Sequence, residues 1–138
     1  MNKNRSELKK KRDIYIRTVR KVKLKERRRV DGKFRLDCNM ASAISAALRG
    51  AKAGRKWQDL VGYTAQDLIQ HLQSQFNKNM SWGNYGSYWW VDHILPRSYF
   101  KYEAAEEPGF KRCWALDNLQ PMEKIANIIK GATVVSPR

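Results

Sequence analysis

The positive charge of this 138-residue chain is concentrated in its first 36 residues. That segment holds 16 of the 28 Lys and Arg residues and 4 acidic residues, whereas residues 37–138 hold 12 basic and 9 acidic ones. The total length corresponds to one domain, which excludes a multi-domain machine. The sequence therefore predicts a basic arm, residues 1–36, followed by one nearly balanced globular domain, residues 37–138.

The composition of the whole chain favours a folded protein with an acidic partner. Hydrophobic residues make up 42% of the sequence and aromatic residues 11%, which is too much for a wholly disordered polyelectrolyte. The net charge of +15 and the isoelectric point near 10.1 attract polyanions. Nucleic acid is the partner that this charge favours most, because a basic arm attracts phosphates whatever their sequence.

The arm has a helical pattern. Four of its apolar residues are spaced as on one face of a helix: Leu8, Tyr15, Val19 and Val22. We expect a basic amphipathic helix, with Arg27, Arg28 and Arg29 among its phosphate contacts. A disordered solvated tail is the alternative. Helices that bind calmodulin or membrane surfaces share the pattern, but this apolar stripe is thin and contains no Trp.

Cysteines and apolar runs are few. Cys38 and Cys113 lack the CxxC pairs of structural zinc sites, so no structural zinc and no disulfide framework are expected. The charged N-terminus has no apolar signal-peptide segment, and no stretch approaches 18 apolar residues, so no membrane partner is expected. The sequence predicts a cytoplasmic protein with reduced thiols.

Apolar spacing predicts three helices after the arm, at residues 36–48, 65–76 and 123–130. The second of these helices has the clearest start signal, because Thr64 and Asp67 are spaced for a capping arrangement. Two short strands are expected as well. Residues 88–94 form an aromatic, β-prone run that Pro96 closes, and residues 113–116 are the second candidate.

Three polar segments are predicted to be connections. Residues 50–56 form a loop that lacks the GK[ST] ending of a phosphate-binding P-loop, so no nucleotide site is expected. Residues 78–86 form a second loop, anchored by aromatic side chains. Residues 97–111 form a third, in which Pro108 and Gly109 interrupt any helical turn.

Asp92 and His93, adjacent in the sequence WWVDHILP, are the residues best suited to chemistry. Neighbouring strand residues point to opposite faces, so both can serve one site only where the strand bends or ends, as the approach to Pro96 allows. A carboxylate can hold a metal ion while the imidazole beside it removes a proton from water. The alternatives are a hydrogen-bonded core histidine and an aspartate that caps a turn.

The segments around this pair follow one another in a characteristic order: GYTAQDLIQHLQSQF, MSWGNYG, WWVDHILP, NLQPM, then Asn127 and Lys130. In this order they resemble the phage-encoded HNH endonucleases, over about residues 44–131 with a motif core at 86–131. The resemblance implies an α+β, mostly helical fold, in which N-terminal basic helices precede a ββα-metal hairpin-helix core.

The resemblance also implies a role for each motif residue. His93 would be the general base, and Asp92 the first metal ligand. Asn118 would bind backbone across the loop and orient His93. Asn127 stands where the family's last His usually stands, so the chain looks like an HNN variant with an amide oxygen as second ligand, although a mid-helix Asn is also commonly a solvent-facing residue. One carboxylate and one amide oxygen favour Mg²⁺ or Mn²⁺ over zinc.

Phosphate contacts are expected from three cationic residues near the motif. Lys130 lies one helical turn beyond Asn127, although a Lys is favoured in a last helical turn in any case. Arg97 and Lys124 are further candidates. His71, far from the motif in sequence, is expected to be a packing or surface residue.

The expected activity is hydrolysis of phosphodiester bonds in double-stranded DNA, by an endonuclease or nickase that leaves 5′-phosphate and 3′-hydroxyl ends. Phage packaging or replication proteins would be its protein partners, and the cytoplasm of a bacterial host its compartment. The sequence carries no dimer signature. Two alternatives remain: a DNA-binding or packaging accessory protein of the same fold that has lost cleavage, and an RNA-binding, ribosome-associated basic protein.

Overall fold

A computed structural model describes residues 2–50 and 56–130, apart from the side chains of Asn2, Asn127 and Ile128. The described helices are α1 (Asn2–Val30), α2 (Gly32–Leu48), α3 (Lys56–Val61), α4 (Ala65–Gln73), α5 (Pro108–Cys113) and α6 (Lys124–Lys130). The strands β1 (Trp89–His93) and β2 (Leu119–Glu123) form an antiparallel pair, and short 3₁₀ helices lie at Trp82–Asn84, Arg97–Tyr99 and Leu116–Asn118. The predicted α+β, mostly helical class is confirmed.

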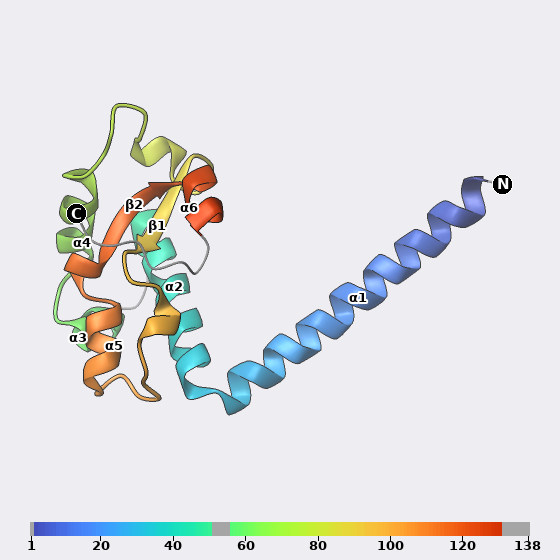
Figure 1. The fold of residues 1–138 in the computed structure, drawn as a ribbon, viewed down its shortest axis with the longest axis horizontal. Coiled ribbons are helices and arrows are strands. Elements are labelled where there is room, and N and C mark those ends of the chain that lie inside the picture. Colours follow the sequence, from blue (N-terminus) through green and yellow to red (C-terminus); the bar gives the residue numbers. More distant parts are fainter. Residues whose placement is uncertain (1, 51–55, 131–138) are drawn as a thin grey trace.

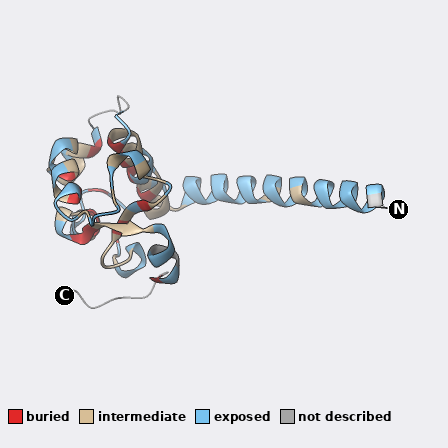
Figure 2. Ribbon diagram, turned by 90° about the horizontal axis from the view of Figure 1, so that it is seen from above, coloured by how far each residue is buried: buried red, intermediate tan, exposed pale blue. Residues whose placement is uncertain are grey.

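Helix α1 projects away from the rest of the protein as a long rod (Figure 1). Figure 2 shows that nearly all of it is exposed to solvent. The apolar Leu8, Tyr15 and Val22 of the predicted stripe are among its exposed residues. The arm is therefore helical, as its spacing predicted, and most of its apolar face is exposed. No helix in the described ranges is long and apolar enough to cross a membrane.

The chain turns between α1 and α2 at Asp31. The Asp31 carboxylate accepts a hydrogen bond from the backbone N–H of Phe34, at 3.0 Å, and so caps the N-terminus of α2. The Arg27 guanidinium lies 4.0 Å over the Phe34 ring, a cation–π contact that joins the two helices across the turn. Helix α2 consequently begins at Gly32, four residues earlier than apolar spacing predicted.

The core lies between α2, α4 and the sheet. Met40, Ile44 and Leu48 recur every four residues along α2 and are buried, as predicted. On α4, Leu68 and Leu72 are fully buried. Thus the apolar faces of the two helices pack against each other, and α4 also packs against β2.

The capping arrangement predicted for α4 is present. The Thr64 hydroxyl accepts from the Asp67 N–H at 3.1 Å, and the Asp67 carboxylate accepts from the Thr64 N–H at 2.9 Å. The helix ends at Gln73, three residues before the predicted end at Phe76. Phe76 instead packs against the wholly buried Trp89 of β1, with ring centroids 5.0 Å apart.

The sheet pairs β1 with β2 in a register that runs from Trp89 opposite Glu123 to His93 opposite Leu119. Trp82 and Tyr85, from the predicted loop at 78–86, pack against Trp89 as aromatic anchors. Strand β1 ends at His93, close to the predicted boundary before Pro96.

Two predictions between the strands were wrong. Cys113 ends α5 and Leu116 begins a 3₁₀ turn, so residues 113–116 are not a strand and the second strand lies at Leu119–Glu123. Pro108 does not interrupt a helix but starts α5, because a proline at the first helical position forgoes an N–H that would have no helical partner. Burial of Phe110 and Cys113 then holds this turn against the core.

Two short helices, α3 and α6, remain. The helix predicted at residues 123–130 is present as α6. Helix α3, at Lys56–Val61, was not predicted; it buries Trp57. Of the predicted loop at residues 50–56, the stretch 51–55 lies outside the described residues.

Candidate functional site

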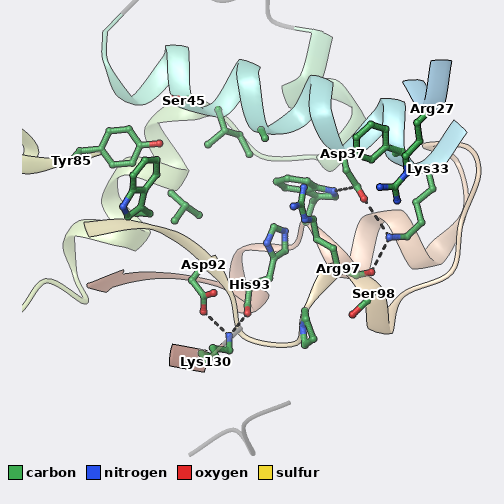
Figure 3. Close-up of a pocket in the computed structure, with 17 residues that line it drawn as sticks. Arg27, Lys33, Asp37, Ser45, Tyr85, Asp92, His93, Arg97, Ser98 and Lys130 are labelled. Carbon is green, nitrogen blue, oxygen red and sulfur yellow. Dashed lines mark hydrogen bonds and ion pairs between the residues drawn. The ribbon is translucent and has the colours of Figure 1, made fainter. Parts of the chain in front are cut away.

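A cavity of about 700 Å³ opens beside the end of β1 (Figure 3). Asp92 and His93 of β1 line it, together with Lys33 and Asp37 of α2 and Lys130 of α6. The strand ends at His93, which is the condition under which two adjacent strand residues can serve one site. The two residues that the sequence singled out therefore meet in one hollow of the protein.

Asp92 is buried and held by two donors from other elements. The Lys130 ammonium lies 2.7 Å from Asp92 Oδ2, and Gln120 Nε2 donates to the same oxygen at 3.0 Å. Lys130 also donates to the backbone carbonyl of His93, so one ammonium ties α6 to both residues of the pair. Lys130 is itself buried, which places its charge on Asp92 rather than in solvent.

His93 packs its ring edge-on against Trp114, with ring centroids 4.5 Å apart and an interplanar angle of 84°. Its Nε2 atom is buried and makes no hydrogen bond within the described part of the chain. Burial, reinforced by the positive charges of Arg97, Lys130 and Lys33, lowers the pKa of His93 to about 3. The imidazole is therefore neutral at pH 7, and by a wider margin than the ordinary pKa of a histidine would give.

Asn118 is buried and clamps the backbone that follows His93. Its Oδ1 accepts from the Leu95 N–H at 2.8 Å, while its Nδ2 donates to the carbonyls of Leu95, at 3.2 Å, and Cys113, at 2.9 Å. The Ile94 N–H donates to the Asn118 backbone carbonyl at 2.8 Å. These bonds fix the turn that ends β1, and with it the position of His93.

The other predicted contact residues divide between the cavity and its surroundings. Arg27 and Arg97 line the cavity. Arg28 donates to Asn39, and Arg29 forms an exposed ion pair with Glu26 at 2.6 Å. Lys124 is exposed and lies 6.0 Å from the centre of the Trp90 ring.

Asn127 lies on α6 and His71 on α4. The backbone of Asn127 belongs to α6, but its side chain lies outside the described residues, so its predicted role as a ligand stays a prediction. His71 is a packing residue, as expected: its Nε2 lies 2.8 Å from the Leu119 carbonyl oxygen.

Sequence reasoning missed a second buried carboxylate at the cavity, Asp37. It is 5% exposed, forms an ion pair with Lys33 at 3.3 Å, and accepts from the indole N–H of Trp114 at 3.1 Å. A signal for it was available. Asp37 lies three and seven residues before Met40 and Ile44, which puts a carboxylate on the apolar face of the predicted helix.

The donor set around Asp92 is compatible with a hard divalent cation. Asp92 supplies a buried anionic oxygen that already binds the ammonium of Lys130. Mg²⁺ is commonly bound through one or two carboxylates while it keeps several waters. In residues 2–50 and 56–130 no cluster of three or more His, Cys, Asp or Glu side chains forms a fuller metal site. A metal at Asp92 would therefore share the carboxylate with Lys130 or displace it, and would complete its coordination from other groups.

Comparison with known proteins yields two relatives. No protein-family model matches the chain, and no solved structure matches it. It is 31% identical over 111 residues to "Uncharacterized protein L426" of Acanthamoeba polyphaga mimivirus, which covers 80% of this chain and 48% of that protein. It is 27% identical over 104 residues to "Uncharacterized protein L246" of the same virus, covering 75% and 45%. The chain thus spans about half the length of the curated relatives it matches.

Proposed function

We propose that this chain is a metal-dependent endonuclease or nickase of the HNH type that hydrolyses phosphodiester bonds in double-stranded DNA. The observation that carries the proposal is the buried Nε2 of His93, which has no hydrogen-bond partner among the described residues and lies in a cavity beside Asp92. A buried polar atom without a partner is rare in folded proteins, and at the wall of a cavity it is explained by a bound ligand, an ordered water or a chemical role. The order β1, β2, α6 also agrees with the ββα-metal core that the resemblance implies.

The charges around the cavity support a phosphate-bearing substrate. Arg27, Lys33, Arg97 and Lys130 line it, against the two carboxylates Asp37 and Asp92. The exposed basic helix α1 leads away from this rim and would continue the phosphate contacts along a duplex. Arg28 and Arg29 at its end, and Lys124 on α6, would add to them.

In this proposal a bound Mg²⁺ or Mn²⁺, held by Asp92 and Asn127, would supply Lewis-acid stabilisation of negative charge on the phosphate. His93 would accept a proton from the attacking water at Nε2. Its burial makes the imidazolium costly, and the incoming phosphate would offset that cost. Asn118 would keep the imidazole in place through the backbone that it clamps. The Lys130 ammonium would leave its ion pair with Asp92 and bind a substrate phosphate.

The chemistry of the ends tests the proposed reaction. Hydrolysis that leaves a 5′-phosphate and a 3′-hydroxyl gives nicks that DNA ligase reseals directly. We expect ligatable nicks from the wild type and from His71→Gln, which alters the other histidine of the chain, and none from His93→Ala. Nicks that require end repair before ligation would contradict this mechanism.

A second candidate function is a DNA-binding or packaging accessory protein that does not cleave. The ion pair between Lys130 and Asp92 favours it, because the proposed metal ligand is already neutralised by a cation of the chain itself. Such a protein would bind duplex DNA with equal affinity in EDTA and after His93→Ala, and would cut it under neither condition. Phage packaging or replication proteins in the cytoplasm of a bacterial host would be the partners of either form.

A further inference from the structure

Trp114 lies between His93 and a carboxylate on another element. One side of its indole packs against the His93 ring, with centroids 4.5 Å apart, while its Nε1–H donates to Asp37 Oδ1 at 3.1 Å. Trp114 is 2% exposed, and its backbone carbonyl accepts from the Tyr63 hydroxyl at 2.6 Å. The indole is therefore fixed both through its own N–H and through its backbone.

The Asp37 carboxylate interacts with three donor groups. The Tyr102 hydroxyl and the Trp114 indole both donate to Oδ1, and the Lys33 ammonium lies 3.3 Å from Oδ2. A buried carboxylate is costly unless donors of this kind satisfy it. Three donors from different elements converge on one acceptor group, so replacing the carboxylate disturbs each of them.

The His93 ring itself has no such anchor. Its Nε2 is buried without a hydrogen bond to any described residue, so the orientation of the imidazole depends on packing. Among the described aromatic rings, Trp114 is the one that packs against it, at an interplanar angle of 84°. A hydrogen bond that fixes the indole therefore also restricts the imidazole.

We infer that Asp37 is a positioning residue: through Trp114 it sets the orientation of the His93 ring. The inference rests on the proposed function for its consequence in catalysis, but the coupling itself can be observed without catalysis. A general base displaced by about 1 Å loses on the order of 100-fold in rate. Loss of the hydrogen bond between Asp37 and the indole would thus reduce kcat. Trp114→Phe removes that bond but keeps the ion pair of Lys33 with Asp37, so it would leave the phosphate contacts that determine KM.

The test combines NMR with kinetics. The chain contains only two histidines, so proton–carbon correlation spectra of imidazole rings show two sets of signals, which His93→Gln assigns. The variants are Asp37→Asn and Trp114→Phe, the second of which keeps a ring but loses the indole N–H. Trp57→Phe is the matched control, because Trp57 is a buried indole whose Nε1 has no hydrogen-bond partner among the described residues.

We expect Asp37→Asn and Trp114→Phe to shift the His93 ring signals and leave those of His71 in place. On a DNA duplex with Mn²⁺, we expect kcat to fall about tenfold or more in both variants. KM should stay within about twofold in Trp114→Phe, which keeps the ion pair between Lys33 and Asp37. Trp57→Phe should leave the His93 signals and kcat unchanged. If Asp37→Asn does not fold, Trp114→Phe alone decides.

Folded variants with unchanged His93 signals would overturn the inference, whether or not the wild type cleaves DNA. Shifted His93 signals with a kcat equal to that of the wild type would overturn the positioning role as well. If the signals shift and the wild type does not cleave under any metal, the coupling holds and the proposed function fails, so the two failures are distinguishable.

Discussion

The ammonium of Lys130 lies 2.7 Å from Oδ2 of Asp92, and both side chains are buried. Lys130 is the last residue of α6 and Asp92 lies on β1, so this pair joins the end of the helix to the strand that carries His93. A cation of the chain itself thus binds the carboxylate that we propose as a metal ligand. Competition between the Lys130 ammonium and a divalent metal ion for Asp92 should change the free energy of unfolding.

Lys130→Met should destabilise the protein in EDTA by about 3–5 kcal/mol, because it removes the cation from a buried ion pair. Mn²⁺ should then stabilise this variant more than the wild type, since the added cation no longer competes with Lys130. Guanidinium denaturation with and without Mn²⁺ measures both effects. The exposed Lys124→Met serves as the control. Equal stability of wild type and Lys130→Met in EDTA would contradict the role given to the pair.

His93 should make stability depend on pH. Its pKa is lowered to about 3 in the folded protein, against about 6.5 in an unfolded chain. The unfolded chain therefore binds the proton first as pH falls, and the free energy of unfolding should decrease by about 1.4 kcal/mol per pH unit between about pH 6 and pH 4. Above about pH 6.5 this contribution is constant.

Denaturant unfolding in EDTA across that range measures the slope. In His93→Gln the slope should be smaller by the contribution of one proton, while His71→Gln should retain the slope of the wild type. Parallel curves for wild type and His93→Gln would show that the imidazole is not held neutral by burial.

Asn118→Ala should lower the free energy of unfolding by about 2–4 kcal/mol, because three hydrogen bonds to backbone are removed and buried partners are left unsatisfied. The same change should reduce cleavage, since the backbone after His93 is released. The exposed Asn39→Ala is the control for replacing an asparagine. Thermal unfolding and cleavage rates, measured on the same preparations, check both. If the free energies of unfolding of Asn118→Ala and Asn39→Ala were equal, the hydrogen bonds of Asn118 would not stabilise the turn after His93.

The arm should contribute to DNA binding through charge alone. Replacing Arg27, Arg28 and Arg29 by Gln should weaken duplex binding and reduce the slope of log K against log salt by up to about three, roughly one for each phosphate that is no longer neutralised. Fluorescence anisotropy of a labelled duplex from low to moderate salt gives the slope. Lys111→Gln on α5 is a single-charge control away from the arm. An unchanged slope in the triple variant would remove these residues from the DNA interface.

Local signals in the sequence predicted the local structure well. Thr64 and Asp67 form the capping box that their spacing implied, and Met40 and Ile44 lie on the buried face of their helix. These features depend on residues within one or two helical turns of each other. The β-prone run at residues 88–94 likewise became β1, with Trp89 in the core.

The failures involve contacts between distant parts of the chain. Pro108 was interpreted as a helix breaker, although burial of Phe110 makes it a helix start. The ion pair of Lys130 with Asp92 spans 38 positions, and the hydrogen bond of Trp114 to Asp37 spans 77. No spacing rule links residues so far apart, so neither the neutralisation of Asp92 nor the hydrogen bond from Trp114 to Asp37 could be predicted from pattern alone. The place of Asp37 on the apolar face of its helix could have been.

The most direct measurement is relaxation of supercoiled plasmid by the purified protein at low salt, with Mg²⁺, Mn²⁺ or EDTA. We expect nicked or linear product with a divalent metal, none with EDTA, none with His93→Ala, and activity close to that of the wild type with His71→Gln. Tight DNA binding without cleavage under any metal, or cleavage that survives both EDTA and His93→Ala, would contradict the proposed function.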